Sequence, residues 1–140
     1  MSDDIKIKIK QTFEDSISVK LKVIENNILE SLERAGDVIA KSLSQGGKLM
    51  ICGNGGSAAD AQHLAAEFLV RLTSNVNREG IPAISLALDN STMTACGNDY
   101  KFDDIFLRPF KALSKKNDVL IVFTTSGNSK NIIKVLKEAK

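Results

Sequence analysis

The sequence is poor in several residue types and patterns that mark other classes of protein. Its 140 residues include no tryptophan, one histidine, one tyrosine and two cysteines, Cys52 and Cys96. Two cysteines so far apart exclude a disulfide framework or a zinc knuckle, so we expect two buried, reduced thiols. No apolar run approaches the length of a membrane span, and the N-terminus lacks the apolar stretch of a signal peptide. We therefore expect a cytoplasmic protein with no membrane partner.

The sequence also lacks a strong excess of charge of either sign. Lysine and arginine number 19, aspartate and glutamate number 17, and the net charge is +2. This excess is too small and too scattered to indicate nucleic acid as a partner, and no RNA-reading aromatic motif is present. With 43% hydrophobic and 26% charged residues, the composition is that of one ordinary globular domain.

One stretch, residues 48–71, organises the rest of the chain. Leu49–Cys52 is an apolar run without polar alternation, which is typical of a parallel strand buried on both faces. Gly53–Gly56 follows and contains three glycines, which let a ligand approach bare backbone. Ser57, with Asp60 three residues later, predicts the N-cap of a helix. Because a helix N-terminus favours negative charge, phosphate is the expected ligand.

The remaining segments predict a doubly wound α/β domain. Two amphipathic helices are expected over residues 3–45, and two more buried strands over residues 83–88 and 119–123. Further helices are expected at residues 92–95, where Gly97–Tyr100 should end the helix, at 102–113 and at 129–140. This order predicts a parallel sheet between two layers of helices, a three-layer αβα sandwich. We expect a single domain over 1–140, with a helical part at 1–47 and an α/β core at 48–140.

A second turn, Thr124–Ser129, repeats the arrangement of the first after another apolar strand. Because the carboxyl ends of parallel strands meet at one edge of a sheet, the two turns should converge. Together they offer N–H groups and hydroxyls but neither lysine nor arginine, which suits a small phosphate ester. Ordinary N-capping is the alternative, although four hydroxyls in six residues exceed what one cap requires.

His63 and Glu67 lie four residues apart on the helix that follows the first turn, so they share one face. A solvated polar pair is the ordinary interpretation of such spacing. The position beyond the carboxyl end of a strand also suits a catalytic base or a metal ligand.

Three motifs, G-N-G-G-S-A-A-D-A-Q-H, G-N-D-Y and T-S-G-N-S-K-N, resemble the phosphoheptose isomerase branch of the sugar-isomerase (SIS) family. The resemblance implies an SIS fold and a homotetramer with active sites at subunit interfaces. It also implies an isomerase that converts sedoheptulose 7-phosphate to D-glycero-D-manno-heptose 7-phosphate through an enediol, for bacterial heptose biosynthesis. Members of this family continue beyond the helix that follows T-S-G-N-S. We therefore expect the chain to be C-terminally incomplete and inactive by itself.

The resemblance further implies which residues would form the site. Glu67 would be the catalytic base in contact with the substrate, and zinc, which polarises sugar oxygens, would bind His63 and Glu67. The other zinc ligands and a second proton-transfer group would come from the missing segment. The implied substrate-binding residues are Asn54, Gly55, Gly56, Ser57, Asn98 and Asp99 for the sugar side and Thr124, Thr125, Ser126 and Ser129 for the phosphate.

Two other function classes compete with the isomerase. A non-catalytic SIS protein that binds sugar phosphates or associates with a replication initiator shares the fold. Glu67 and the uninterrupted T-S-G-N-S favour the enzyme, whereas the missing C-terminus argues partly against it. A dinucleotide-binding oxidoreductase would fit Gly53-x-Gly55-x-x-Ala58, but Asp89 lies far beyond the roughly 20 residues expected for the ribose-binding acid.

Overall fold

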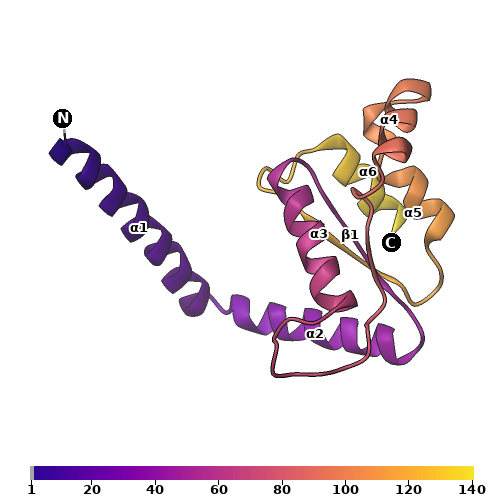
Figure 1. Cartoon of the computed structure of the whole chain (residues 1–140), viewed down its shortest axis with the longest axis horizontal. Coiled ribbons are helices and arrows are strands. Elements are labelled where there is room, and N and C mark those ends of the chain that lie inside the picture. Colours follow the sequence, from indigo (N-terminus) through magenta and orange to yellow (C-terminus); the bar gives the residue numbers. More distant parts are fainter. Residues whose placement is uncertain (1) are drawn as a thin grey trace. The chain divides into compact units, whose positions relative to one another are not determined.

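The computed structural model describes residues 2–140 of the protein, with side-chain exposure described from residue 4 onward. The chain divides into two compact units, Met1–Val38 and Ile39–Lys140. The elements in chain order are α1 (Ser2–Glu25), α2 (Ile28–Ser44), β1 (Leu49–Gly53), α3 (Gly56–Leu69), β2 (Ala83–Ser85), α4 (Asn90–Asp99), the short 3₁₀ helix η1 (Phe102–Asp104), α5 (Leu107–Leu113), β3 (Val119–Phe123) and α6 (Lys130–Glu138) (Figure 1).

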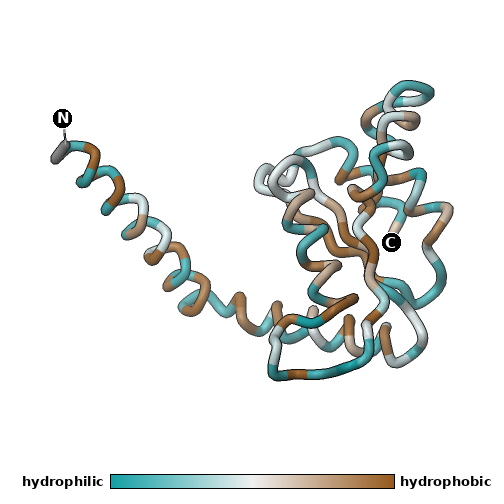
Figure 2. Tube along the Cα trace, in the orientation of Figure 1, coloured by the Kyte–Doolittle hydropathy of each residue, from teal (hydrophilic) through white to brown (hydrophobic). Residues whose placement is uncertain are grey.

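The first unit is helical, as the four-residue apolar spacing predicts. Asn27 has a positive φ of 55° and separates α1 from α2. Apolar residues recur along α1, and Figure 2 shows their positions as repeated brown bands on the tube. Five of them recur every four residues and are all more than half exposed: Ile5, Ile9, Phe13, Ile17 and Leu21. The helix therefore carries an uncovered apolar face along most of its length.

The second unit contains a three-stranded parallel sheet with the order β2-β1-β3. Leu49 of β1 pairs with Ala83 on one side and with Val119 on the other. The chain thus moves from β1 to one edge and then returns across β1 to the other edge, which is the doubly wound arrangement. This confirms the predicted α/β class with its parallel sheet.

Burial of β1 on both faces explains the two helical layers. Met50 and Cys52 point into a core completed by α4, η1, α5 and α6, with Phe106, Ile132 and Val135 at its centre. Leu49 and Ile51 point to the opposite face, where Ala61 and Ala65 of α3 cover them together with Ile39 and Leu43 of α2. Because successive side chains of β1 point to opposite faces of the sheet, each face needs its own layer of helices.

Two segment predictions are wrong in detail. The predicted strand 83–88 ends at Ser85: Leu86 N still donates to Ile51 O, but the chain then turns and Leu88 is 64% exposed. The predicted break at Gly97–Tyr100 does not occur, because α4 continues through Gly97 to Asp99. Cys96 is buried against the core and its carbonyl accepts from Tyr100 N. This packing outweighs the helix penalty of about 1 kcal/mol for one glycine.

Cys52 and Cys96 are both free and buried, as expected. Burial raises the pKa of the Cys52 thiol to about 12, so it stays neutral and unreactive at physiological pH. In the part of the chain that the structure describes, none of the helices combines the length and apolar character that crossing a membrane requires.

An ion pair ties the beginnings of β1 and β3 together. The Asp118 carboxylate accepts from Lys48 N at 2.9 Å, from Lys115 N at 2.7 Å and from the Lys48 ammonium. The Asp118 side chain is only 5% exposed. Burial raises the pKa of Asp118, but the hydrogen bonds from Lys48 and Lys115 outweigh it and leave the pKa below its ordinary value of 3.8. The folded state therefore favours the charged carboxylate.

We predict that Asp118→Asn lowers the free energy of unfolding at pH 7 by about 2 kcal/mol, because hydrogen bonds to a charged group are lost. Since the folded-state pKa is the lower one, the stabilisation is complete above the ordinary value and is lost as pH falls below about 3.8. Urea denaturation of both proteins between pH 7 and pH 3 measures the difference, which should shrink toward the acidic end.

Glu138→Gln provides the control, because Glu138 pairs with Lys111 at 3.2 Å where both side chains are at least 40% exposed. It should change stability by less than about 1 kcal/mol. A difference between wild type and Asp118→Asn that does not vary with pH would contradict the role given to the carboxylate charge.

Candidate functional site

The first turn begins where β1 ends, and two glycines determine its shape. A Cβ on Gly53 would lie 2.5 Å from the Ser57 carbonyl oxygen, so only glycine lets the strand and helix approach so closely. Gly55 has φ 57° and ψ −122°, a conformation that side chains rarely adopt, and it is the N-cap of α3. The prediction of Ser57 as N-cap is therefore wrong: Ser57 lies within the first turn of the helix.

The first turn uses some of its own donors. Ser57 N donates to Asn54 O and Ala58 N donates to Gly55 O, each at 3.0 Å. These two N–H groups are thus occupied within the turn, and the first turn has fewer free donors than its sequence predicts.

The second turn leaves more donors free. Thr124 Oγ1 and Ser126 Oγ accept from the backbone of their own turn, at Gly127 N and Asn128 N. Ser129 is the N-cap of α6 but makes no side-chain capping bond. Within residues 2–140, the N–H groups of residues 129–131 donate to no other group of the chain. The start of α6 is therefore the stronger candidate for receiving an anion.

The two turns converge at the carboxyl end of the sheet, as predicted. They line one small cavity of about 50 Å³, formed by Asn54, Ser57, Phe123, Thr124, Thr125, Ser126 and Ser129. None of these residues is charged. A reciprocal amide pair joins the turns: Asn54 Nδ2 donates to Asn131 Oδ1 at 3.0 Å, and Asn131 Nδ2 donates to Asn54 Oδ1 at 2.8 Å. The sequence analysis gave no role to Asn131, although it ends the T-S-G-N-S-K-N motif.

Glu67 lies in a different cavity. Ser57 and Glu67 are both on α3, ten residues and hence roughly 15 Å apart along the helix axis. The second cavity, about 320 Å³, is lined by Leu64, Glu67, Phe68, Leu72, Arg78 and Ile81. Glu67 Oε1 lies 2.9 Å from His63 Nε2, and Glu67 Oε2 is buried without a hydrogen-bond partner among the described residues. One carboxylate oxygen is thus left available to a group that enters this cavity.

Arg78 is a residue whose importance the sequence analysis missed. Its guanidinium donates to the carbonyl oxygens of Glu67 at 2.6 Å, Phe68 at 2.8 Å and Glu79 at 2.9 Å. A cation is stabilising at a helix C-terminus, where carbonyl groups lack helical partners. Arg78 therefore joins the loop after α3 to the last helical turn of α3, which carries Glu67.

Asn98 and Asp99 lie apart from both turns in the described structure. They are exposed residues at the end of α4, where Asn98 Nδ2 donates to Asp99 Oδ1 at 2.8 Å. Neither lines the cavity between the turns. Their contact with a sugar stays a prediction.

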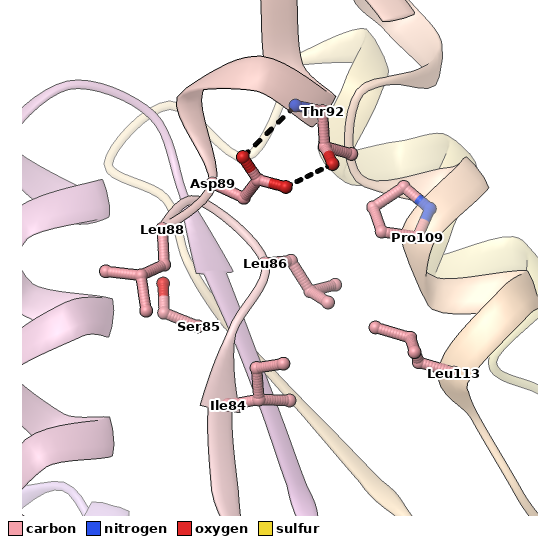
Figure 3. Close-up of a pocket in the computed structure, with 8 residues that line it drawn as sticks. All are labelled: Ile84, Ser85, Leu86, Leu88, Asp89, Thr92, Pro109 and Leu113. Atoms are coloured by element: carbon pink, nitrogen blue, oxygen red, sulfur yellow. Dashed lines mark hydrogen bonds between the residues drawn. The ribbon is translucent and has the colours of Figure 1, made fainter.

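Asp89 has a structural task that weakens the dinucleotide hypothesis. Figure 3 shows its carboxylate bonded to Thr92, and it also accepts from Ser91 N at 2.9 Å as the N-cap of α4. The hydrogen bond from the Thr92 hydroxyl is the main cause of its lowered pKa. The adjoining cavity, about 190 Å³, has mostly apolar walls from Ile84, Leu86, Pro109 and Leu113. A ribose-binding carboxylate would need free oxygen atoms, whereas this one is committed to its own helix.

The zinc prediction can be compared with the donor atoms present. Among residues 2–140, no three or more His, Cys, Asp or Glu side chains are grouped so that they could hold a metal ion. His63 and Glu67 are close enough to act as two ligands, since zinc bonds at a tetrahedral angle require an N···O separation of roughly 3.4 Å. The described residues thus supply two of the four ligands that zinc ordinarily takes and do not complete a site.

Comparison with known proteins matches the chain to one protein family and to named relatives. The SIS domain family matches residues 12–140. A phosphoheptose isomerase of Thermodesulfovibrio yellowstonii is 44% identical over 137 residues, which cover 98% of this chain and 67% of the relative. A phosphoheptose isomerase of Campylobacter concisus is 52% identical over 114 residues, covering 81% of this chain and 59% of the relative. The chain thus spans about three fifths to two thirds of the length of these relatives.

Solved structures agree with this match. The structure of a phosphoheptose isomerase from Neisseria gonorrhoeae superposes with a TM-score of 0.87 at 38% identity, covering 96% of this chain and 68% of that one. One from Francisella tularensis gives a TM-score of 0.88 at 39% identity, with 94% and 68% coverage. The family resemblance drawn from the three sequence motifs is confirmed, and the chain belongs to the SIS domain family.

Proposed function

We propose that the chain provides the phosphate-binding and base-bearing parts of an aldose–ketose isomerase that acts on sedoheptulose 7-phosphate. The observation that carries the proposal is the convergence of two uncharged turns, the second of them rich in hydroxyls, at the carboxyl ends of β1 and β3. Relatives named phosphoheptose isomerase support the substrate and the product, D-glycero-D-manno-heptose 7-phosphate. We propose that this reaction serves heptose biosynthesis in the cytoplasm.

In this proposal the phosphate binds at the start of α6. The N–H groups of residues 129–131 have no acceptor among the described residues, and Thr124, Thr125, Ser126 and Ser129 line the adjoining cavity. Neutral donors at a helix N-terminus stabilise a dianion without a fixed counter-charge. Asn54 and Ser57 line the cavity from the first turn. Gly55 and Gly56 lie between them in the chain, and their contact with the substrate is part of the proposal.

Glu67 is the proposed general base. Isomerisation through an enediol requires a base that removes a proton from one carbon and returns it to the next. Glu67 Oε1 is oriented by His63, while Oε2 is buried and unpaired, so one oxygen is free to accept a proton. Arg78 holds the backbone of the same turn. We further propose that His63 and Glu67 are two ligands of a zinc ion whose other ligands lie outside residues 2–140.

The active sites are proposed to lie at subunit interfaces of a homotetramer. Glu67 and the phosphate turns line separate cavities, roughly 15 Å apart along α3, so a neighbouring chain can bring one to the other. The uncovered apolar row on α1 supports association of several chains, since contiguous apolar surface marks an interface.

The phosphate proposal predicts that Ser126→Asp weakens sugar-phosphate binding at least about tenfold, because a carboxylate beside a phosphate is strongly repelled. Titration calorimetry with sedoheptulose 7-phosphate measures the affinity. Ser91→Asp is the matched control, since it makes the same change in the first turn of α4, outside the cavity, and should not alter affinity. Equal affinity in wild type and Ser126→Asp would mean that the phosphate binds at a different site.

The base proposal predicts that Glu67→Gln binds substrate but loses turnover by about 10²–10⁴-fold, because the amide keeps the shape and loses basicity. The assay needs a longer form in which the remaining third of a relative follows this chain. Exchange of the substrate C1 or C2 proton with deuterated water is the measurement. Glu79→Gln, in the exposed loop, is the matched control and should exchange at the wild-type rate.

Two outcomes of this assay, and a separate analysis of bound metal, test the individual parts of the proposal. Equal exchange by Glu67→Gln and wild type would mean that another group is the base. No exchange by the longer wild type would favour a non-catalytic sugar-phosphate-binding protein. Elemental analysis of His63→Ala decides the metal: bound zinc should fall relative to wild type, and an unchanged amount would contradict His63 as a ligand.

The assembly proposal predicts about four chains per particle by light scattering at micromolar concentration. Ile28→Asn and Leu32→Asn, at positions 43% and 60% exposed, should reduce particle size, because each would place an unpaired amide at the interface at a cost of roughly 1–3 kcal/mol. Glu33→Gln, a neighbouring polar position, should not. A wild-type monomer would contradict the proposal.

Mixing two impaired longer forms, assayed at a substrate concentration too low for Ser126→Asp to turn over, provides a sharper test of shared sites. If Ser126 and Glu67 act from different chains, mixed oligomers of Ser126→Asp and Glu67→Gln should regain activity at about a quarter of their sites. If both act from the same chain, mixing should restore nothing.

A further inference from the structure

Asn131 is a buried polar residue with no role in the function proposed so far. It is neither one of the hydroxyl residues around the phosphate cavity nor the proposed base. It is the second residue of α6, it is 2% exposed, and its neighbours Ile132 and Val135 belong to the apolar core. Burying an amide is costly unless its donors and acceptors are paired. Asn131 Oδ1 accepts from both Ile132 N at 2.9 Å and Asn54 Nδ2 at 3.0 Å, and Nδ2 donates to Asn54 Oδ1 at 2.8 Å.

The partner of Asn131 lies 77 residues earlier, in the turn on the other side of the cavity. Two antiparallel N–H···O bonds between planar amides fix the separation and the relative orientation of the two groups. In the described structure, no other side-chain hydrogen bond joins the Gly53–Ser57 turn to the segment 124–131. β1 and β3 pair up to Gly53 and Phe123, and beyond that point this amide pair is the side-chain link between the two turns.

We propose that Asn131 is a positioning residue that holds the two turns at the separation a phosphate ester requires. This inference rests on the proposed function, because it concerns the same cavity. The side chain of Asn131 is buried and paired with Asn54 and Ile132 N, so it does not itself contact the ligand. It acts through Asn54, whose side-chain amide is committed to Asn131, so that the ligand meets an already ordered site and spends little binding energy on ordering it.

A purely local role for Asn131 makes different predictions. Oδ1 alone would satisfy Ile132 N, one of the donors that a helix start leaves unpaired. Such a role would confine the effect of a substitution to α6. The positioning role requires that a change at residue 131 reach the Gly53–Ser57 turn.

Hydrogen exchange of the ligand-free chain, followed by NMR, tests this first. In Asn131→Ala, the amides of Ser57 and Ala58, which are bonded within the first turn, should exchange about tenfold faster. Asn54→Ala should produce a reciprocal increase at Ile132 and Ile133. The double variant should be no worse than either single one, because both lose the same pair.

Lys134→Ala is the matched control on the same helix. It removes the 2.7 Å bond to Asp104 and so loosens α6 without touching the pair. It should leave exchange at Ser57 and Ala58 unchanged. If Asn131→Ala does not fold, Asn131→Asp takes its place, since it keeps the acceptor for Ile132 N and replaces the donor to Asn54 Oδ1 with a carboxylate oxygen that repels it. Faster exchange confined to α6 in either variant would overturn the proposal.

Titration with sedoheptulose 7-phosphate and with inorganic phosphate tests the consequence for binding. Asn131→Ala should lower affinity for both at least about fivefold, and Lys134→Ala should lower neither. Unchanged affinity in Asn131→Ala would overturn the positioning role even if wild type binds well. If wild type binds neither probe, the proposed function fails, and the exchange experiment still decides whether Asn131 couples the two turns.

Discussion

The complete burial of β1 is the constraint on which the rest of the structure depends. Leu49, Met50, Ile51 and Cys52 have no exposed surface, and they alternate between the two faces of the sheet. A strand paired on both edges and apolar on both faces must have a strand on each side and helices above and below. The crossing from β2 back over β1 to β3 satisfies that requirement and leaves the carboxyl end of β1 open. The same end carries the first turn of the candidate site.

Segments whose structure follows from local physics could be predicted from the sequence. The apolar runs of β1 and β3, the four-residue row of α1 and the Asp89 cap of α4 all express preferences that act over a few residues. The prediction of Ser57 as N-cap was wrong for an equally local reason. Gly55 adopts the N-cap conformation, so α3 begins before the first side chain that could cap it. The end of α4 was misjudged because packing of Cys96 against the core, a tertiary contact, outweighs the glycine beside it.

The parts of the site that the sequence could not predict depend on contacts between distant residues. Hydroxyl spacing indicates the second turn, but nothing in the spacing pairs Asn54 with Asn131 across 77 positions. Similarly, Arg78 belongs to a polar loop by composition, and only the folded chain brings it to the carbonyl groups of Glu67 and Phe68. Glu67 lies ten residues after Ser57 on α3, and only the folded chain shows that it lines a cavity separate from that of the turns.

The close approach of Gly53 to Ser57 restricts how this protein can vary during evolution. Because a Cβ at residue 53 would meet backbone atoms rather than a flexible side chain, any replacement there must displace the first turn of α3 from β1. The junction between β1 and α3 therefore has almost no freedom to change, whereas exposed positions such as Asn128 in the second turn can vary. Descendants of this sequence that acquire a preference for a different ligand would have to change side chains that line the cavity while this junction stays the same.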